Sequence, residues 1–257
     1  MLNNVHLKRS ESTKKFYKCM HKLRKESSHL QCFFDLYRTC RSHHMTFIKT
    51  IRLRPHWAEY LMLKYPSLKL IYLVRDPRAT LYSQAKTFRK FNFQWSIKNV
   101  STSHCGILGE DLEAVRLLQE RFPGRVKAMR YEHGATDPLG YTAVIYRFLG
   151  LTVTSEVTDY VKSLTTPQDL GTDNTKRPKN IAYMTHRDNP RNAMQHWRHE
   201  TGIKEVRAMD SQCSHLYGKM GYRTVATQAQ LKNTDTIDLN VSPESGGIFG
   251  DSENWGG

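Results

Sequence analysis

Residues 75–83 bring together side chains that could bind an anion. Arg75 and Arg78 each carry a guanidinium group with several hydrogen-bond donors, and Ser83 adds a hydroxyl group. Arginine pairs closely with phosphate and similar anions because its planar donors match their oxygen atoms. The residue types in this segment therefore indicate a phosphate-binding site.

The flanking residues predict where these donors lie in the fold. Residues 68–74 are a short apolar run rich in Leu, Ile, Tyr and Val, which is typical of a buried strand. Apolar residues then recur at helical spacing from Leu81 onward. Pro77 suits the first position of a helix, and Asp76 can accept hydrogen bonds from the free amides just beyond it. The donors are thus expected at the carboxyl end of a strand beside a helix N-terminus, where α/β sheets bind ligands and anions are favoured.

The segment from Arg75 to Ser83 resembles the 3′-phosphate-binding element of sulfotransferases that use 3′-phosphoadenosine 5′-phosphosulfate (PAPS). In that family an arginine ends a strand, a serine follows eight residues later, and both side chains hold the 3′-phosphate of the cofactor. The sequence LVRDPRA at 73–79 is most similar to the Golgi carbohydrate sulfotransferases. The resemblance implies that the cofactor-binding residues are Arg75, Asp76, Pro77, Arg78, Ala79, Thr80, Leu81, Tyr82 and Ser83.

Two later segments carry the same resemblance. Arg130-Tyr131-Glu132 ends a second expected strand, and Asp137-Pro138 then opens a helix that stops at Gly150. Trp197-Arg198 follows a charged stretch at 172–191, which resembles a loop that closes over the cofactor in the family.

The wider pattern alternates strands with helices, which predicts a parallel sheet covered on both faces. The expected strands are 45–53, 68–74 and 125–131, and the expected helices are 55–64, 77–90, 109–122, 137–149 and 206–220. Residues 91–105 read as a stretch that could form a substrate loop. The resemblance implies the P-loop NTPase-like α/β fold of sulfotransferases.

Three parts are expected along the chain. They are a basic arm at 1–30, a partial sulfotransferase domain at 31–223, and a disordered polar tail at 224–257. The family carries an earlier strand and a loop that wraps the 5′-phosphosulfate, and nothing before Thr46 matches them. The chain is therefore expected to be truncated at its N-terminus, to bind 3′-phosphoadenosine 5′-phosphate weakly and to turn over poorly alone.

Composition bounds the possible partners and the compartment. The 257 residues carry a net charge of +15, which favours polyanions such as nucleic acid, sulfated glycans or a multiply charged cofactor. The five cysteines lack metal-ligand spacing, so zinc is not expected, and in an oxidising compartment they could form disulfides. No transmembrane run or signal peptide is expected.

The resemblance implies an enzyme that transfers sulfate from PAPS to a sugar hydroxyl in the Golgi lumen. The expected acceptor is the 6-hydroxyl of N-acetylglucosamine, galactose or N-acetylgalactosamine in a glycan or glycosaminoglycan. No metal and no nucleic-acid partner are expected, and a membrane is involved only through an anchor missing from this chain.

Glu132 and His104 are considered as general bases, and no catalytic residue is assigned. Two alternatives stay open, an inactive fragment or pseudoenzyme that binds nucleotide or sulfated glycan, and a basic nucleic-acid-binding protein.

Overall fold

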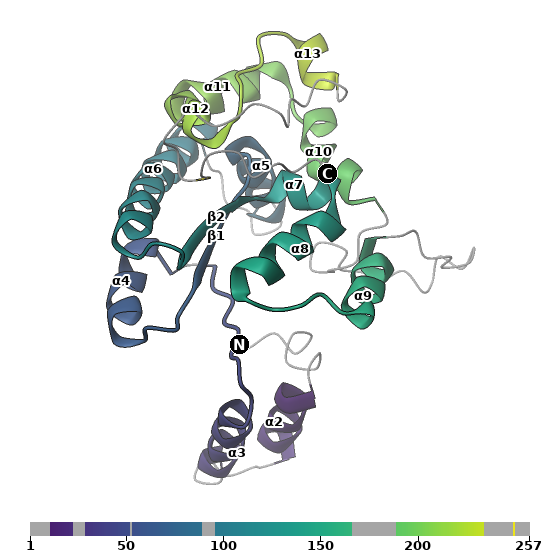
Figure 1. Cartoon of the computed structure of the whole chain (residues 1–257). Coiled ribbons are helices and arrows are strands. Elements are labelled where there is room, and N and C mark those ends of the chain that lie inside the picture. Colours follow the sequence, from purple (N-terminus) through teal and green to yellow (C-terminus); the bar gives the residue numbers. More distant parts are fainter. Residues whose placement is uncertain are drawn as a thin grey trace, which may run out of the picture. The chain divides into compact units, whose positions relative to one another are not determined.

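The chain divides into two compact units, residues 1–52 and 53–257, which we describe separately. The computed structural model (Figure 1) describes residues 11–22, 29–51, 53–88, 96–165, 189–233 and 249.

The first unit contains two helices, α2 (Glu11–Lys22) and α3 (His29–Arg41), which pack against each other. A disulfide joins Cys19 in α2 to Cys32 in α3, and the ring centroids of Phe16 and Phe33 lie 5.3 Å apart. The predicted division at residue 30 thus falls inside this pair of helices, because the compact unit continues to Arg52.

The strand expected at 45–53 is not formed. Residues 45–50 have no regular secondary structure, and Phe47, Ile48 and Ile51 are 75%, 76% and 84% exposed. A strand must pair its backbone groups with a neighbour, and none of the described strands pairs with this segment. Apolar and β-branched composition alone therefore gave the wrong prediction here.

The second unit is built around two parallel strands. The strands β1 (Leu70–Val74) and β2 (Val126–Arg130) pair with Leu70 opposite Val126 and Val74 opposite Arg130. Both strands were predicted, each slightly longer than observed. The observed architecture is α/β, mostly helical around a small parallel sheet.

Two helices connect the strands. After β1 the chain forms α5 (Pro77–Phe88), and α6 (Ile97–Arg121) then leads back to β2. The loop expected at 91–105 is therefore helical from Ile97, while residues 89–95 lie outside the described part. Ile97 and Val100 pack onto the core at helical spacing, and this periodicity outweighs the polar composition of the segment.

One face of the sheet forms the main core. Val74, Val126 and Ala128 point to this face and pack with side chains of α6 and of α4 (Pro55–Lys64), whose predicted bounds were correct. The helix α11 (Ile203–Cys213) packs against α6, and a buried disulfide joins Cys105 to Cys213. Alternating side chains of the two strands thus anchor the helices that cover this face.

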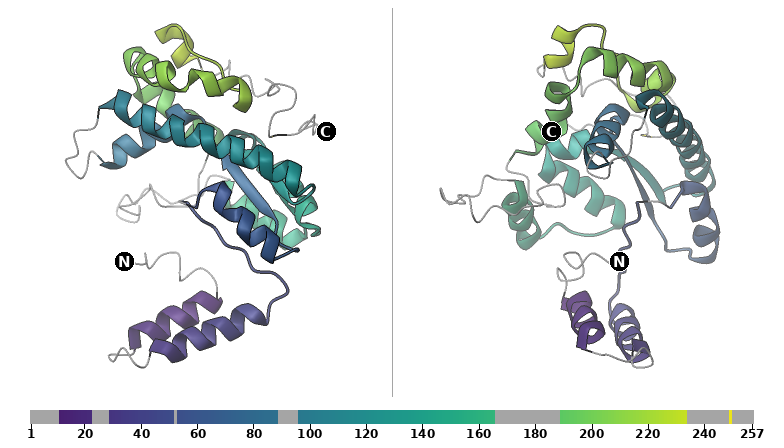
Figure 2. Two further views of the ribbon diagram at one scale, coloured as in Figure 1. Left: turned by 90° about the vertical axis from the view of Figure 1, so that its left-hand side faces the viewer. Right: turned by 180° about the vertical axis from the view of Figure 1, so that it is seen from behind.

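The opposite side of the sheet is covered by α8 (Pro138–Leu149), as Figures 1 and 2 show. The side chain of Asp137 accepts a hydrogen bond from the Gly140 amide, and Gly150 adopts a left-handed φ of 75°. The predicted cap and stop are confirmed. The short helix α7 (Tyr131–Thr136) precedes α8, and α9 (Ser155–Thr165) follows it.

The C-terminal part returns to the ends of the strands. It comprises α10 (Pro190–Glu200), α11, the 3-10 turn η5 (Ser214–Leu216), α12 (Tyr217–Met220) and α13 (Gln228–Lys232). The tail expected from residue 224 is wrong at its start, because Val225 and Leu231 are buried against Trp197 and Val206. The rest of that tail and most of the loop expected at 172–191 lie outside the described residues.

None of the described helices combines the length and apolarity needed to cross a membrane.

We expect the Cys105–Cys213 disulfide to stabilise the second unit strongly. It closes a loop of 108 residues, and removing a native disulfide of this kind typically lowers the free energy of unfolding by about 2–5 kcal/mol. Chemical denaturation of Cys105→Ser should show this loss, whereas Cys40→Ser, which changes an exposed free cysteine, should not. Equal stability of the two variants would show that the bridge contributes little.

Candidate functional site

The candidate site lies where both strands end. Val74 ends β1 opposite Arg130, which ends β2, and Arg75 follows Val74 directly. The helices α5 and α7 begin at once after these strands, so their N-termini meet at the same edge. The predicted position of the arginines at the carboxyl end of a strand is confirmed, and β2 adds a further arginine there.

The turn from β1 into α5 has the predicted capping. Asp76 Oδ1 accepts a hydrogen bond of 2.9 Å from the Arg78 amide, and the Asp76 carbonyl accepts one from the Thr80 amide. Pro77 occupies the first position of the helix. The side chain of Asp76 therefore satisfies an amide that would otherwise lack a partner.

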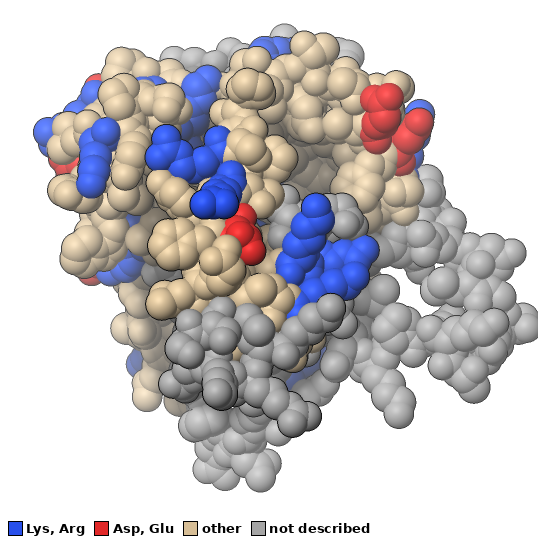
Figure 3. All heavy atoms as spheres, turned by 90° about the horizontal axis from the view of Figure 1, so that it is seen from below, with Lys and Arg blue, Asp and Glu red and all other residues tan. Residues whose placement is uncertain are grey.

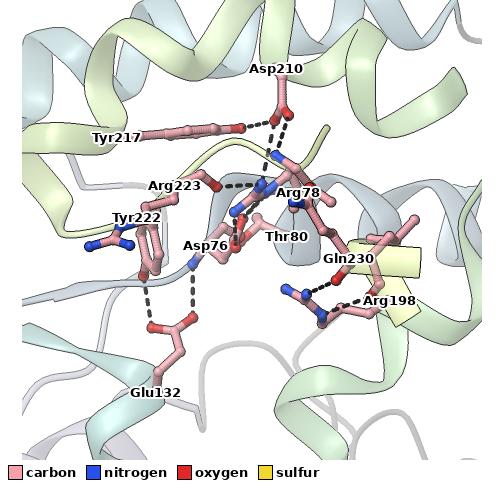
Figure 4. Close-up of polar contacts among 12 residues, drawn as sticks. Asp76, Arg78, Thr80, Glu132, Arg198, Asp210, Tyr217, Tyr222, Arg223 and Gln230 are labelled. Atoms are coloured by element: carbon pink, nitrogen blue, oxygen red, sulfur yellow. Dashed lines mark hydrogen bonds and ion pairs between the residues drawn. The ribbon is translucent and has the colours of Figure 1, made fainter. Parts of the chain in front are cut away.

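Arg78 is held in a buried ion cluster (Figure 4). Its Nε and Nη2 donate to the carboxylate of Asp76 at 3.0 and 2.8 Å, and its Nη1 donates to the Arg223 carbonyl at 2.9 Å. Asp210 lies 3.5 Å from the same Nη1 and accepts a hydrogen bond from Tyr217. The guanidinium group of Arg78 is thus occupied by the protein itself.

Arg75 has a different environment. Its guanidinium carbon lies 4.7 Å from the centre of the Tyr131 ring. Its Nε is buried and has no hydrogen-bond partner among the described residues. A buried donor without a partner is unfavourable unless a ligand supplies the acceptor. Of the two predicted arginines, Arg75 is therefore the one with a donor to offer a ligand.

The rest of the predicted segment divides into packing and surface positions. Ala79 and Leu81 are buried, and the Tyr82 hydroxyl donates to Glu200 in α10 at 3.1 Å. Ser83 is exposed on α5 and lies about 9 Å along the helix axis from Pro77, at 1.5 Å per residue. Its exposure leaves Ser83 accessible to a ligand at this edge.

The side chain of Glu132 in α7 forms hydrogen bonds with the turn before α5 and with the segment after α12. Its Oε1 accepts from the Asp76 amide at 2.9 Å, and its Oε2 accepts from the Tyr222 hydroxyl at 2.7 Å (Figure 4). Burial raises the pKa of the Glu132 carboxyl. Both oxygens are used by donors of the protein, which supports a positioning role. The other candidate base, His104, lies in α6, where burial lowers its pKa.

A cavity of about 290 Å³ lies beside this edge. Its lining includes the end of β2, the α10 residues Trp197 and Arg198, and residues 221–225. Four arginines and two carboxylates line it, namely Arg78, Arg130, Arg198, Arg223, Asp76 and Glu132. Sequence reasoning did not select Arg130, although its place at the end of an expected strand was a usable signal.

Basic side chains also mark the surface. On the face in Figure 3, Lys and Arg outnumber Asp and Glu among the described residues, in keeping with the charge of +15.

Among all the residues that the structure describes, no group of three or more His, Cys, Asp and Glu side chains could hold a metal ion.

We expect Asp76→Asn to lower the free energy of unfolding by about 3–5 kcal/mol, because it leaves the buried Arg78 without its closest counter-charge. Asparagine can still cap α5, so the change isolates the ion pair. In the double variant Asp76→Asn/Arg78→Met the loss should be smaller. Additive losses measured by chemical denaturation would contradict this coupling.

Glu132 should make stability depend on pH. Because burial raises its pKa, its contribution to the free energy of unfolding is complete below the ordinary value of 4.5 and falls as pH rises through the raised pKa. Glu132→Gln stays neutral and should therefore lose less stability than the wild type as pH rises above 4.5. Denaturation at several pH values measures this, and parallel curves for the two proteins would exclude it.

Glu113→Gln is the matched control for that experiment. Glu113 is exposed on α6, and its hydrogen bonds with Arg116 lower the pKa of its carboxyl. Its contribution to stability is lost as pH falls, so this control should change the pH slope in the opposite direction, and by less.

Comparison with known proteins agrees with this geometry. Residues 3–155 match the model of the sulfotransferase family. Carbohydrate sulfotransferase 4 of Mus musculus is 28% identical over 243 residues, which cover 84% of this chain and 58% of that protein. Carbohydrate sulfotransferase 1 of Danio rerio is 31% identical over 213 residues, covering 76% and 48%, and carbohydrate sulfotransferase 6 of Homo sapiens is 28% identical over 221 residues, covering 78% and 53%.

The chain spans about half the length of the curated relatives it matches. The region that matches the family model includes both strands and the arginines at their ends, and it covers more than half of the 257 residues. A parallel pair of strands with cationic ends and a match of this extent lead to one conclusion: this chain belongs to the sulfotransferase family.

Proposed function

We propose that this chain acts in the transfer of sulfate from PAPS to a sugar hydroxyl, and that residues 75–83 hold the 3′-phosphate of the donor. Arg75 would supply the charged donor and Ser83 a hydroxyl group from α5. Asp76, Pro77 and Arg78 would fix the turn between them, and residues 79–82 would anchor the helix.

The observation that carries this proposal is the contrast between Arg75 and Arg78. Arg78 is saturated by Asp76, Asp210 and a carbonyl group, whereas the buried Nε of Arg75 has no partner among the described residues. Arg75 also lies two residues before Pro77, the first residue of α5, where the helix N-terminus favours an anion. A phosphate group would satisfy both features.

The reaction itself requires position and charge more than covalent chemistry. The bond between sulfur and the bridging phosphate oxygen breaks, a bond between sulfur and the sugar oxygen forms, and the hydroxyl proton passes to a base. The products are 3′-phosphoadenosine 5′-phosphate and a sugar sulfate. Residues 75–83 would contribute by fixing the donor nucleotide, and we assign no residue to the base.

The relatives and the cysteines support a proposal for the acceptor and for the compartment. The relatives are named carbohydrate sulfotransferases, so we propose a glycan acceptor sulfated at a 6-hydroxyl of N-acetylglucosamine, galactose or N-acetylgalactosamine. Two disulfides suit an oxidising compartment, which supports the Golgi lumen. The net positive charge would favour acidic glycans, including glycosaminoglycans.

Calorimetric titration with 3′-phosphoadenosine 5′-phosphate tests the proposal. Arg75→Ala should weaken binding about tenfold or more, because it removes a charged donor, and Ser83→Ala should weaken it by a factor of a few. Adenosine 5′-phosphate, which lacks the 3′-phosphate, should bind to these variants almost as it binds to the wild type. Arg116→Ala is the charge-matched control, since Arg116 pairs with Glu113 and Glu120 on α6.

Two outcomes would contradict the assignment. If Arg75→Ala weakened both nucleotides equally, the arginine would not contact the 3′-phosphate. If Arg116→Ala had the same effect as Arg75→Ala, net charge alone would explain the loss. Nucleotide binding without transfer of labelled sulfate to a glycan terminating in N-acetylglucosamine would support the pseudoenzyme alternative.

A further inference from the structure

Arg130 is a buried arginine whose donors are not all satisfied. It ends β2 and is 2% exposed. Its Nε and Nη1 are buried and have no hydrogen-bond partner among the described residues. Its guanidinium carbon lies 4.8 Å from the centre of the Tyr222 ring. This contact stabilises the cation, but the ring does not accept hydrogen bonds from Nε and Nη1. A charge in this state requires an anion.

The carboxylate of Glu132, which interacts electrostatically with Arg130, does not meet that requirement. Glu132 accepts hydrogen bonds from the Asp76 amide and the Tyr222 hydroxyl, which occupy one oxygen each. Burial raises the pKa of Glu132, and the positive charge of Arg130 acts in the opposite direction. The two groups therefore interact through space, while two nitrogen atoms of Arg130 still lack an acceptor in the part of the chain that the structure describes.

The cavity beside Arg130 carries excess positive charge. Arg198 donates to the carbonyl groups of Leu231, Gln230 and Asn233, which are neutral and leave its charge uncompensated. Arg78 is balanced by Asp76 and Asp210. With four arginines and two carboxylates in its lining, the cavity favours a negatively charged occupant.

This cavity shares Asp76 and Arg78 with the turn at 76–78, but it does not include the side chains proposed to contact the 3′-phosphate. Neither Arg75 nor Ser83 is among the residues that line it. Val74 and Arg130 are directly opposite in the sheet, so Arg75 is one position beyond Arg130 in the register. Side chains alternate between the faces of a strand, and the two arginines accordingly stack on different tyrosines, Tyr131 and Tyr222.

We propose that this cavity binds a second oxyanion, a sulfate or phosphate ester group, with Arg130 as its charged donor. The volume of about 290 Å³ is at the lower end of the range for ligand pockets, which suits one esterified group with its sugar better than a whole nucleotide. The source of the group, donor or acceptor, rests on the proposed function. The anion site itself does not.

Equilibrium dialysis of the full chain with radiolabelled inorganic sulfate tests the site, with chloride keeping the ionic strength constant. Arg75→Ala removes the other expected anion site and should still bind sulfate. Arg75→Ala/Arg130→Gln should bind it at least tenfold more weakly. Arg75→Ala/Arg116→Gln has the same net charge as the second variant and should bind like Arg75→Ala. Equal binding by all three proteins would overturn the proposal.

Stability separates a binding role from a structural one. Arg130→Gln removes a buried charge with two nitrogen atoms that have no acceptor among the described side chains and backbone groups, so its thermal midpoint without sulfate should equal or exceed that of the wild type. Addition of sulfate should raise the midpoint of Arg75→Ala, which keeps only this site, but not that of Arg75→Ala/Arg130→Gln. A large loss of stability in Arg130→Gln without sulfate would instead show that the arginine supports the fold, and would overturn the proposal.

Competition identifies the source of the anion. In Arg75→Ala, displacement of sulfate by N-acetylglucosamine 6-sulfate would assign the group to the glycan, and displacement by 3′-phosphoadenosine 5′-phosphate would assign it to the donor. Failure of both to displace sulfate would overturn the assignment to an ester group. If the wild type bound sulfate but not the nucleotide, the proposed function would be refuted, and the anion site at Arg130 would still be supported.

Discussion

The ion pair between Arg78 and Asp76 is the interaction on which the second unit depends. Both groups are buried, and a buried arginine is costly unless carboxylates and carbonyl groups take up its donors. Asp76 supplies two of these contacts from the same turn, while Asp210 and the carbonyl of Arg223 supply the others from the C-terminal part. The C-terminal helices must therefore return to the strand ends, 145 residues away along the chain, for the unit to be complete.

The same constraint shapes the candidate site. The return of the chain brings Tyr222 to Glu132, and Glu132 in turn holds the Asp76 amide at the start of α5. The two strand ends, the helix N-terminus and the C-terminal segment are thus linked by hydrogen bonds shorter than 3 Å. A site built in this way can hold its donors in place before a ligand arrives, which reduces the entropy lost on binding.

Features set by neighbours along the chain could be predicted from the sequence. The bounds of α4, the Asp137 cap of α8 and its stop at Gly150 follow from local rules for proline, aspartate and glycine. Features set by distant partners could not. Residues 45–50 have the composition of a strand yet pair with none of the described strands, and Val225 lies in a polar stretch yet is buried against α10 and α11. Packing between remote segments decided both cases.

The arginines show most clearly what sequence alone leaves undetermined. The Arg-Asp-Pro-Arg pattern predicts an anion-binding site at the end of β1. It does not distinguish Arg75 from Arg78, and it does not include Arg130. Burial and pairing distinguish them: Arg78 has acceptors for its donors, whereas among the described residues one buried nitrogen of Arg75 and two of Arg130 lack an acceptor. Desolvating such a group costs free energy that the fold does not recover. An anionic ligand at each of these two arginines is the arrangement that would recover it.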